Sequence, residues 1–219
     1  MSYTVRVSNT VRVPARSTLT RAEVVAAGAD LLDRTGIHGF SMRKLALQLD
    51  TGAATLYWHI RDKQDLLLAI LDDTLQEVHS RSSASWQERL EALLLDIRAA
   101  LRRRPYLINV VWAAGWQLGP EPLRVGDELL GILADSGLSE GDVPNAYLTL
   151  LVFVYGFVQG EAAAPGNPDF EASTTSTAAS TERDYPNLMR FAVGMEPERI
   201  DERFRYGVAQ QIAGIKSRL

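Results

Sequence analysis

The sequence contains no cysteine and only three histidines, and these shortages limit the chemistry that the chain can perform. Without cysteine there can be no disulfide bond, no thiolate metal site and no cysteine nucleophile. His38, His59 and His79 do not form an HExxH pattern, and the sequence has neither a phosphate-binding loop nor a nucleophile elbow. We therefore predict that the protein is not an enzyme and holds no cofactor or metal.

Long hydrophobic segments are also lacking. The most apolar run, residues 146–158, is too short to cross a bilayer, and the chain does not start with a charged segment followed by an apolar one. We therefore expect a cytoplasmic protein with no membrane partner. Its 219 residues, 46% of them hydrophobic, are enough for one small and one larger domain.

Charge is unevenly distributed along the sequence. The formal net charge is −4, but residues 1–65 carry nine Lys and Arg against six Asp and Glu, whereas the remainder carries 14 against 21. Phosphate binding depends on local charge, so this polarity favours an N-terminal end that docks on nucleic acid. Ordinary scatter of charges is the alternative explanation.

Residues 40–63 have the pattern of two short helices joined by a tight turn. Ser41 is a suitable N-cap for a helix that begins at Met42, and Asp50 and Gly52 interrupt the apolar pattern. The apolar face of this first helix comprises Leu45, Ala46 and Leu49. Because the link between the two helices is short, they must cross sharply.

The second short helix displays an unusual set of side chains. Its inward face is expected to hold Ala53, Leu56 and Ile60. The aromatic residues Tyr57 and Trp58 either complete a small core or lie outside, where they can touch base edges, thymine methyl groups and phosphates. The combination favours DNA contact, and the predicted DNA-binding residues are Arg43, Thr55, Tyr57, Trp58, His59 and Lys63.

Residues from Thr20 to about Leu75 resemble the DNA-binding domain of the TetR family, and the run from Thr55 to His59, followed by Lys63, is similar to the tetracycline repressors themselves. The resemblance implies an all-α fold. Three N-terminal helices would form a helix-turn-helix DNA-binding domain, and a fourth would lead to a larger C-terminal helical domain for ligand binding and dimerisation.

The sequence departs from the family pattern at the turn. Asp50 occupies a position where the family usually has glycine, and residues 52–54 are small where the tetracycline repressors have bulkier base-reading residues. The operator sequence of those repressors therefore does not carry over to this chain.

We divide the chain into a flexible arm at 1–18, the helix-turn-helix domain at 19–65 and the C-terminal domain at 66–219. The arm carries Arg6, Arg12 and Arg16, which either contact DNA or belong to a disordered leader. The first helix should begin at Thr20, which forms a capping box with Glu23, and should end at Gly36.

The C-terminal domain is expected to contain helices only. Their predicted ranges are 62–78, 86–103, 120–136, 144–159, 187–193 and 197–219, with an apolar stretch at 106–116. Residues 162–184 are rich in Ser, Thr, Ala, Gly and Pro, and we predict a mobile loop there. The basic run 102–104 is better explained as a solvated helix end than as a second DNA contact.

The helix predicted at 144–159 is apolar on nearly every side, and such a helix must be buried on every side. A single subunit of this size does that with difficulty. We therefore predict a homodimer in which 144–159 and 197–219 of both subunits form a four-helix bundle. Its two-fold axis would place two recognition helices on successive major grooves of a palindromic double-stranded operator.

Aromatic residues in the C-terminal half exceed what an ordinary core requires, which indicates a cavity for a small-molecule effector, although each residue is also compatible with a core position. In the alignment that the resemblance implies, His79, Leu93 and Leu129 fall on drug contacts of the tetracycline repressors, but no pair of histidine and acid is evident for the magnesium that tetracycline brings. The effector should therefore be more apolar than tetracycline. The predicted ligand-binding residues are His79, Leu93, Ile97, Trp112, Trp116, Leu129, Phe153 and Phe157.

These expectations together predict a repressor that a largely apolar ligand releases from DNA by moving the helix that begins at Asp62. A regulator of the same fold that activates transcription, or that binds no small molecule, is the alternative.

Overall fold

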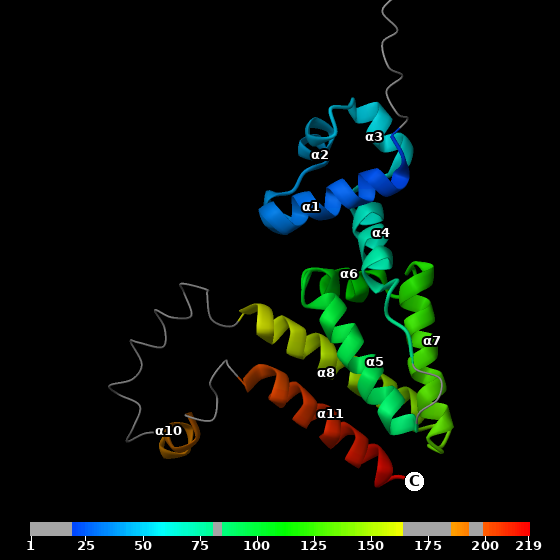
Figure 1. The fold of residues 1–219 in the computed structure, drawn as a ribbon, viewed down its shortest axis with the longest axis vertical. Coiled ribbons are helices and arrows are strands. Elements are labelled where there is room, and N and C mark those ends of the chain that lie inside the picture. The colour runs from blue at the N-terminus through cyan, green and yellow to red at the C-terminus, as the bar shows by residue number, and fades with distance from the viewer. Residues whose placement is uncertain (1–18, 81–84, 164–184, 193–198) are drawn as a thin grey trace, which may run out of the picture.

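The computed structural model describes residues 19–80, 85–163, 185–192 and 199–219, and all regular structure within these ranges is helical. The expected all-α class is confirmed. A head of three helices lies at one end of the molecule, and α4 (Lys63–Leu75) leads from it into a larger body (Figure 1). The head comprises α1 (Arg21–Gly39), α2 (Met42–Gln48) and α3 (Ala53–His59).

The body is built from the helices that follow α4. They are α5 (Trp86–Leu101), α6 (Leu107–Ala114), α7 (Pro120–Asp135), α8 (Val143–Ala163) and α11 (Ile200–Lys216), with the short α10 (Pro186–Ala192) between the last two. Several predicted ranges change: α8 continues through 162–163, which we had assigned to the loop, α4 ends at Leu75 instead of 78, α5 ends at Leu101 instead of 103, and α11 spans Ile200–Lys216. The arm at 1–18 and the rest of the predicted loop, 164–184, lie outside the described residues.

Local sequence signals set the helix ends of the head. Thr20 and Glu23 form the expected capping box, and the Ser41 hydroxyl accepts the Lys44 backbone N–H. Gly36 has a positive φ of 67° and interrupts the helical backbone, but the chain resumes a helical turn up to Gly39. Because glycine tolerates this conformation, α1 can end in a bent turn that leads into α2.

One core runs through the head and into the body along α4. Leu66 and Ile70 of α4 are fully buried, and Leu66 lies so close to Gly28 of α1 that a Cβ there would come within 2.8 Å of its Cδ1. Leu75, at the other end of α4, is buried in the body. The head therefore sits on the same rigid helix that the body encloses.

Helix α8 is the most apolar long helix among the described residues. Its length and composition alone would allow it to cross a bilayer, since a window of it has a mean hydropathy of 1.3, yet the fold buries only 17% of that window. Leu150, Val154 and Val158 are buried in the body, whereas Leu148 and Val152 are more than half exposed. One subunit thus covers one face of α8 and leaves another apolar face open, so the predicted burial on every side does not occur within a single chain.

A buried arginine joins α5, α8 and α11. The Arg98 guanidinium donates to Glu161 Oε2 at 2.9 Å and to Asp201 Oδ1 at 2.6 Å, and it lies over the rings of Phe157 and Phe204. Hydrogen bonds to these carboxylates raise the pKa of Arg98, and the bond to Arg98 lowers the pKa of Asp201. The arrangement fixes α8 against α11 because one charged group satisfies acids on both helices.

We predict that Arg98→Met lowers the free energy of unfolding by about 3 kcal/mol, because it leaves Glu161, whose side chain is only 12% exposed, without its partner. Guanidinium denaturation at neutral pH measures the change. The control is Arg205→Met, which removes an exposed ion pair to Glu91 between α11 and α5 and should cost less than about 1 kcal/mol. Equal effects of the two substitutions would show that the buried network has no special role.

Candidate DNA-binding surface and ligand cavity

Helix α3 presents an exposed aromatic surface. Leu56 and Ile60 are fully buried and attach the helix to the head, while Trp58 is 87% exposed and Tyr57 is 49% exposed. Thr55 is also exposed and His59 is half-buried. The structure therefore excludes the interpretation that Tyr57 and Trp58 complete a core. Ala53, which we expected to face inward, is exposed, since it lies at the first turn, before the helix reaches the core.

The turn between α2 and α3 has a left-handed residue at Asp50, with φ of 46°. The Thr51 N–H donates to the Ala46 carbonyl at 3.0 Å and the Asp50 N–H donates to the Leu47 carbonyl at 3.2 Å, which satisfies carbonyls at the end of α2. Aspartate tolerates this conformation better than most residues other than glycine. Asp50 therefore takes the place of the glycine usual in the family without loss of the sharp turn.

Two predicted DNA-binding cations have different surroundings. Arg43 is exposed on α2. Lys63 is half-buried at the start of α4, where its Nζ donates to the Ile37 carbonyl at 2.8 Å and lies over the Phe40 ring. Lys63 thus holds α1 against α4, and a phosphate would have to share its ammonium group.

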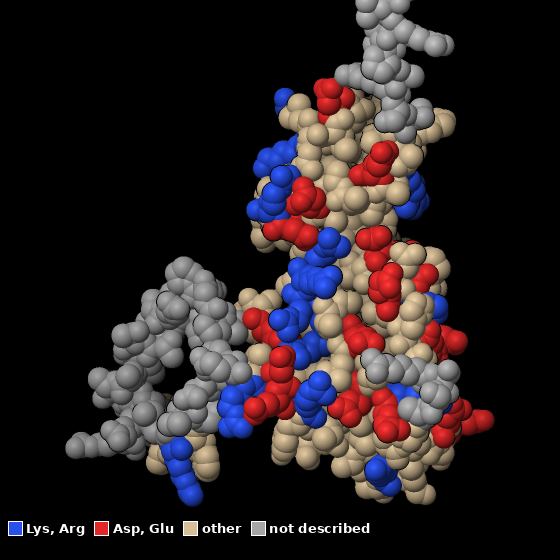
Figure 2. Space-filling model, viewed as in Figure 1, with Lys and Arg blue, Asp and Glu red and all other residues tan. Residues whose placement is uncertain are grey.

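The excess positive charge of residues 1–65 does not belong to the described head. Residues 19–65 carry six basic and six acidic side chains, so the surplus of three comes from the arginines of the arm. On the face seen in Figure 2, basic and acidic side chains alternate over the head without a continuous patch of one sign. Several of these charges are paired with each other, as in Arg21 with Asp65 and Arg34 with Asp30.

The body contains a largely apolar cavity of about 520 Å³ between α5, α6, α7 and α8. This volume suits a drug-sized molecule. Four of the predicted ligand-binding residues line the cavity, namely Ile97, Trp112, Trp116 and Leu129. Trp116 is 94% exposed and Trp112 is half exposed, so neither ring is sealed in the core.

The other four predicted ligand-binding residues lie elsewhere. Leu93 is sealed in the core, and Phe153 and Phe157 pack against Phe204 on the side of α8 that faces α11. His79 is 60% exposed at a surface position, with its Nδ1 4.0 Å from Glu128 Oε1. His79 and Glu128 thus form a pair of histidine and acid that was not evident in the sequence. Glu128, however, already accepts hydrogen bonds from Arg124 and from the Ser80 N–H.

Tyr147 and Tyr155, which line the cavity from α8, are among the lining residues that we did not predict from the sequence. We had assigned this helix to the dimer interface and had chosen Phe153 and Phe157 as its ligand-binding residues. The signal for the two tyrosines was present as the spacing 147, 151, 155, in which every fourth residue lies on one face of a helix.

Two sets of hydrogen bonds connect the cavity walls to the head and to α4. Asp33 of α1 accepts from Arg104 Nε at 3.1 Å and from the Tyr106 hydroxyl at 3.2 Å, directly before α6 begins. Asp72 of α4 accepts the Glu121 N–H at 2.9 Å in the first turn of α7. Burial and the Asp33 charge raise the pKa of Tyr106, so its hydroxyl remains a donor at neutral pH.

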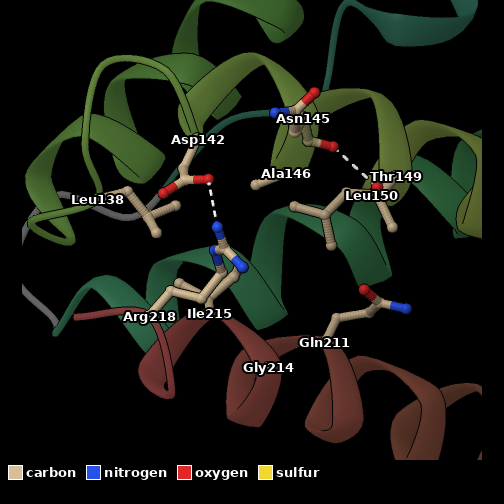
Figure 3. Close-up of a pocket in the computed structure, with 10 residues that line it drawn as sticks. All are labelled: Leu138, Asp142, Asn145, Ala146, Thr149, Leu150, Gln211, Gly214, Ile215 and Arg218. Atoms are coloured by element: carbon tan, nitrogen blue, oxygen red, sulfur yellow. Dashed lines mark hydrogen bonds and ion pairs between the residues drawn. The ribbon is translucent and has the colours of Figure 1, made fainter.

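A second hollow of about 370 Å³ lies between the N-terminal half of α8 and the C-terminal half of α11 (Figure 3). Arg218 closes one end of it by donating to Asp142 Oδ1 at 2.8 Å. Leu150 and Gln211 line the hollow farther from that ion pair, and Asn145 and Thr149 lie along its α8 side. The hollow is an open groove on the α8–α11 face, separate from the cavity.

A helix-turn-helix head with an exposed aromatic recognition helix, carried on an all-helical body, defines a DNA-binding protein of the regulator class. Family comparisons agree. Residues 24–70 match the bacterial regulatory proteins of the tetR family, and residues 80–219 match the tetracyclin repressor-like C-terminal domain. The chain belongs to the TetR family of transcriptional regulators.

Individual relatives cover most of the chain. An HTH-type transcriptional regulator of Saccharopolyspora erythraea is 34% identical over 78% of this chain and 73% of its own length. The class A tetracycline repressor from transposon 1721 of Escherichia coli is 30% identical over 89% of each chain. The crystal structure of ActR from Streptomyces coelicolor with actinorhodin shares the fold, with a TM-score of 0.78, 24% identity and coverage of 92% of this chain and 97% of ActR.

We predict that Trp58→Ala leaves the melting temperature of the protein within about 2 °C of the wild type, since the removed ring is almost wholly exposed. Leu56→Ala, two residues earlier on α3, should instead lower the stability of the head by about 2 to 5 kcal/mol, because it opens a cavity in the core. Differential scanning calorimetry of both variants measures this contrast. A large loss of stability in Trp58→Ala would show that the ring has a structural role.

Proposed function

We propose that the protein is a homodimeric transcriptional repressor that a small, largely apolar ligand releases from a palindromic operator. The observation that carries the proposal is that α1, which packs against the exposed recognition helix, is hydrogen-bonded through Asp33 to the residues directly before α6, and α6 lines the apolar cavity. The names of the relatives support repression, since one is a tetracycline repressor.

The exposed apolar face of α8 supports the dimer. Leu148 and Val152 on α8 and Tyr206 on α11 are all more than half exposed, and these two helices pack side by side at the end of the body farthest from the head (Figure 1). Pairing this face with that of a second subunit would remove the apolar surface from water. Lipid is a poor alternative, because the opposite face of α8 belongs to the protein core and its C-terminal end carries Glu161 in an ion pair.

The DNA contacts that we propose are made by α3 and the start of α2. Thr55, Tyr57 and Trp58 offer a hydroxyl, a phenol and a broad apolar surface to the major groove, and Arg43 offers a cation. His59 is half-buried, and Lys63 is already engaged with the head through the Ile37 carbonyl and the Phe40 ring. A head without net charge binds phosphates weakly by itself, so pairing of two heads is needed for firm binding.

Release of the protein from DNA would depend on α6 and α7, because these helices contact both the cavity and the elements that carry the recognition helix. Both helices line the cavity, and both are tied at their first turns to the head or to α4, by Asp33 and Asp72. A ligand that spreads the cavity walls would shift these ties and alter the separation of the two recognition helices. Such coupling typically changes affinity about 5- to 150-fold, and DNA must then weaken ligand binding by the same factor.

The operator prediction is tested by selection from a randomised DNA duplex library with the full-length protein. We expect enrichment of an inverted repeat whose half-sites are about one helical turn, or a multiple of it, apart. Val152→Asp should yield a monomer in analytical ultracentrifugation and lose most of the affinity, because it buries a charge in the proposed interface. Ala134→Asp, an exposed change on α7 outside the proposed interface, is the control for the added charge and should leave the dimer and its DNA affinity intact. Enrichment of a single unrepeated site by a monomer would refute the proposal.

Release by ligand is tested with Asp33→Asn. An aspartate-to-asparagine change removes the charge that holds Arg104, so we expect compounds that release the wild-type protein from its selected duplex to lose most of that effect, while they still bind the body. Fluorescence anisotropy of labelled duplex, with and without a panel of uncharged aromatic compounds, measures the coupling factor. Asp30→Asn is the matched control, since its partners Arg34 and Gln48 both lie within the head. If no compound that binds the body changes DNA affinity, the protein regulates without a small-molecule effector.

A further inference from the structure

Helix α8 lines the ligand cavity with a repeating stripe of residues. Tyr147, Leu151 and Tyr155 follow one another at intervals of four and all contribute to the cavity wall. The stripe is distinct from the buried face of α8 toward the core and from its exposed face. Two phenols are therefore built into a wall that is otherwise mainly aliphatic and aromatic carbon.

The hydroxyl of Tyr147 reaches across the cavity toward α7. A Cβ placed on Gly126 would lie 2.9 Å from this oxygen, so the absence of a side chain at Gly126 makes room for it. Gly126 also lines the cavity. The Tyr155 ring is held edge-on to Trp112, with ring centroids 5.6 Å apart and an interplanar angle of 85°. Packing thus fixes both phenols in place.

Neither hydroxyl is hydrogen-bonded to a described residue, although Tyr155 is 91% buried. Within the described residues, every side-chain oxygen that has no accessible surface also has a hydrogen-bond partner. The Tyr155 hydroxyl must therefore reach open space, and the space that this side chain lines is the cavity. Water in the cavity can pair with this hydroxyl, but a ligand that displaces the water without offering an acceptor leaves the hydroxyl unpaired, which costs free energy.

The remaining lining defines what else the ligand can carry. Among the described residues, no lysine, arginine or histidine lines the cavity, and the one acid there, Asp127, is exposed. An anionic ligand would find no counter-charge. The indole rings of Trp112 and Trp116 offer flat apolar surfaces to a ring system.

The geometry points to Tyr147 and Tyr155 as a pair of hydrogen-bond donors that select uncharged, multi-ring ligands bearing carbonyl oxygens. This inference rests on the proposed function of the cavity as the effector site and names the chemistry that the effector must have. Burial raises the pKa of both phenols, so each remains protonated and able to donate at neutral pH. A hydrocarbon of the same shape would leave both donors unpaired and bind more weakly.

The test uses 9-fluorenone and fluorene, which share a flat three-ring skeleton and differ in that the first has a carbonyl where the second has a methylene group. Binding of each to the full-length protein is measured at micromolar concentration through quenching of tryptophan fluorescence. We expect the wild type to bind fluorenone about 2- to 12-fold more tightly per hydrogen bond formed. Tyr155→Phe and Tyr147→Phe should each reduce this preference, and the double variant should abolish it while its affinity for fluorene is retained.

Tyr185→Phe is the matched control, because this tyrosine is exposed directly before α10, outside the cavity and the proposed dimer face, and its hydroxyl should have no influence. Equal affinity of the wild type for the two compounds, or an unchanged preference in the double phenylalanine variant, would overturn the inference, as would binding of neither compound. Operator selection does not involve these tyrosines. Failure of carbonyl recognition would therefore leave the repressor proposal standing, and failure of operator binding would leave a measured carbonyl preference intact.

Discussion

The structure depends on the burial of α4 by two domains at once. Its first turns complete the core of the head, where Leu66 and Ile70 have no exposed surface, and its last turn lies in the body with Leu75. A helix packed at both ends cannot bend cheaply in the middle, because its hydrogen bonds and its packing would both be lost. Any movement of α4 relative to the body must therefore rotate the whole head as a rigid unit. Coupling of ligand binding to DNA binding would require such a rigid connection.

Much of the head was predictable because its signals are local. The capping box at Thr20, the N-cap at Ser41 and the helix breaker at Asp50 each act within a few residues, so the sequence places them without knowledge of tertiary contacts. The exposure of Trp58 could not be settled in this way. An aromatic ring at helical spacing is compatible with a core or with a surface, and only the positions of α1 and α4 decide which of the two it occupies.

The cavity was less predictable, because its wall is assembled from four helices. The sequence indicated that aromatic residues were in excess, and Trp112 and Trp116 do line the space, but Phe153 and Phe157 belong to the cluster around Arg98 and Phe204. Which aromatic residues of α8 meet the cavity depends on the rotation of that helix about its own axis. Gly207 helps to set this rotation, since a Cβ there would lie 2.5 Å from the Phe153 ring and α11 can approach so closely only without one.

Different faces of α8 have different neighbours. This explains why the helix is apolar on nearly every side although most of it is not buried within one subunit. Leu150, Val154 and Val158 face the core, the stripe from Tyr147 to Tyr155 faces the cavity, and Leu148 and Val152 face outward. In the proposed dimer the outward face would meet the partner. A ligand that presses on the tyrosine stripe would then act on the helix that also sets the distance between subunits. Because an α-helix transmits a displacement of one face to the others as a rigid body, ligand binding and the spacing of the two heads would be coupled through α8 as well as through α4.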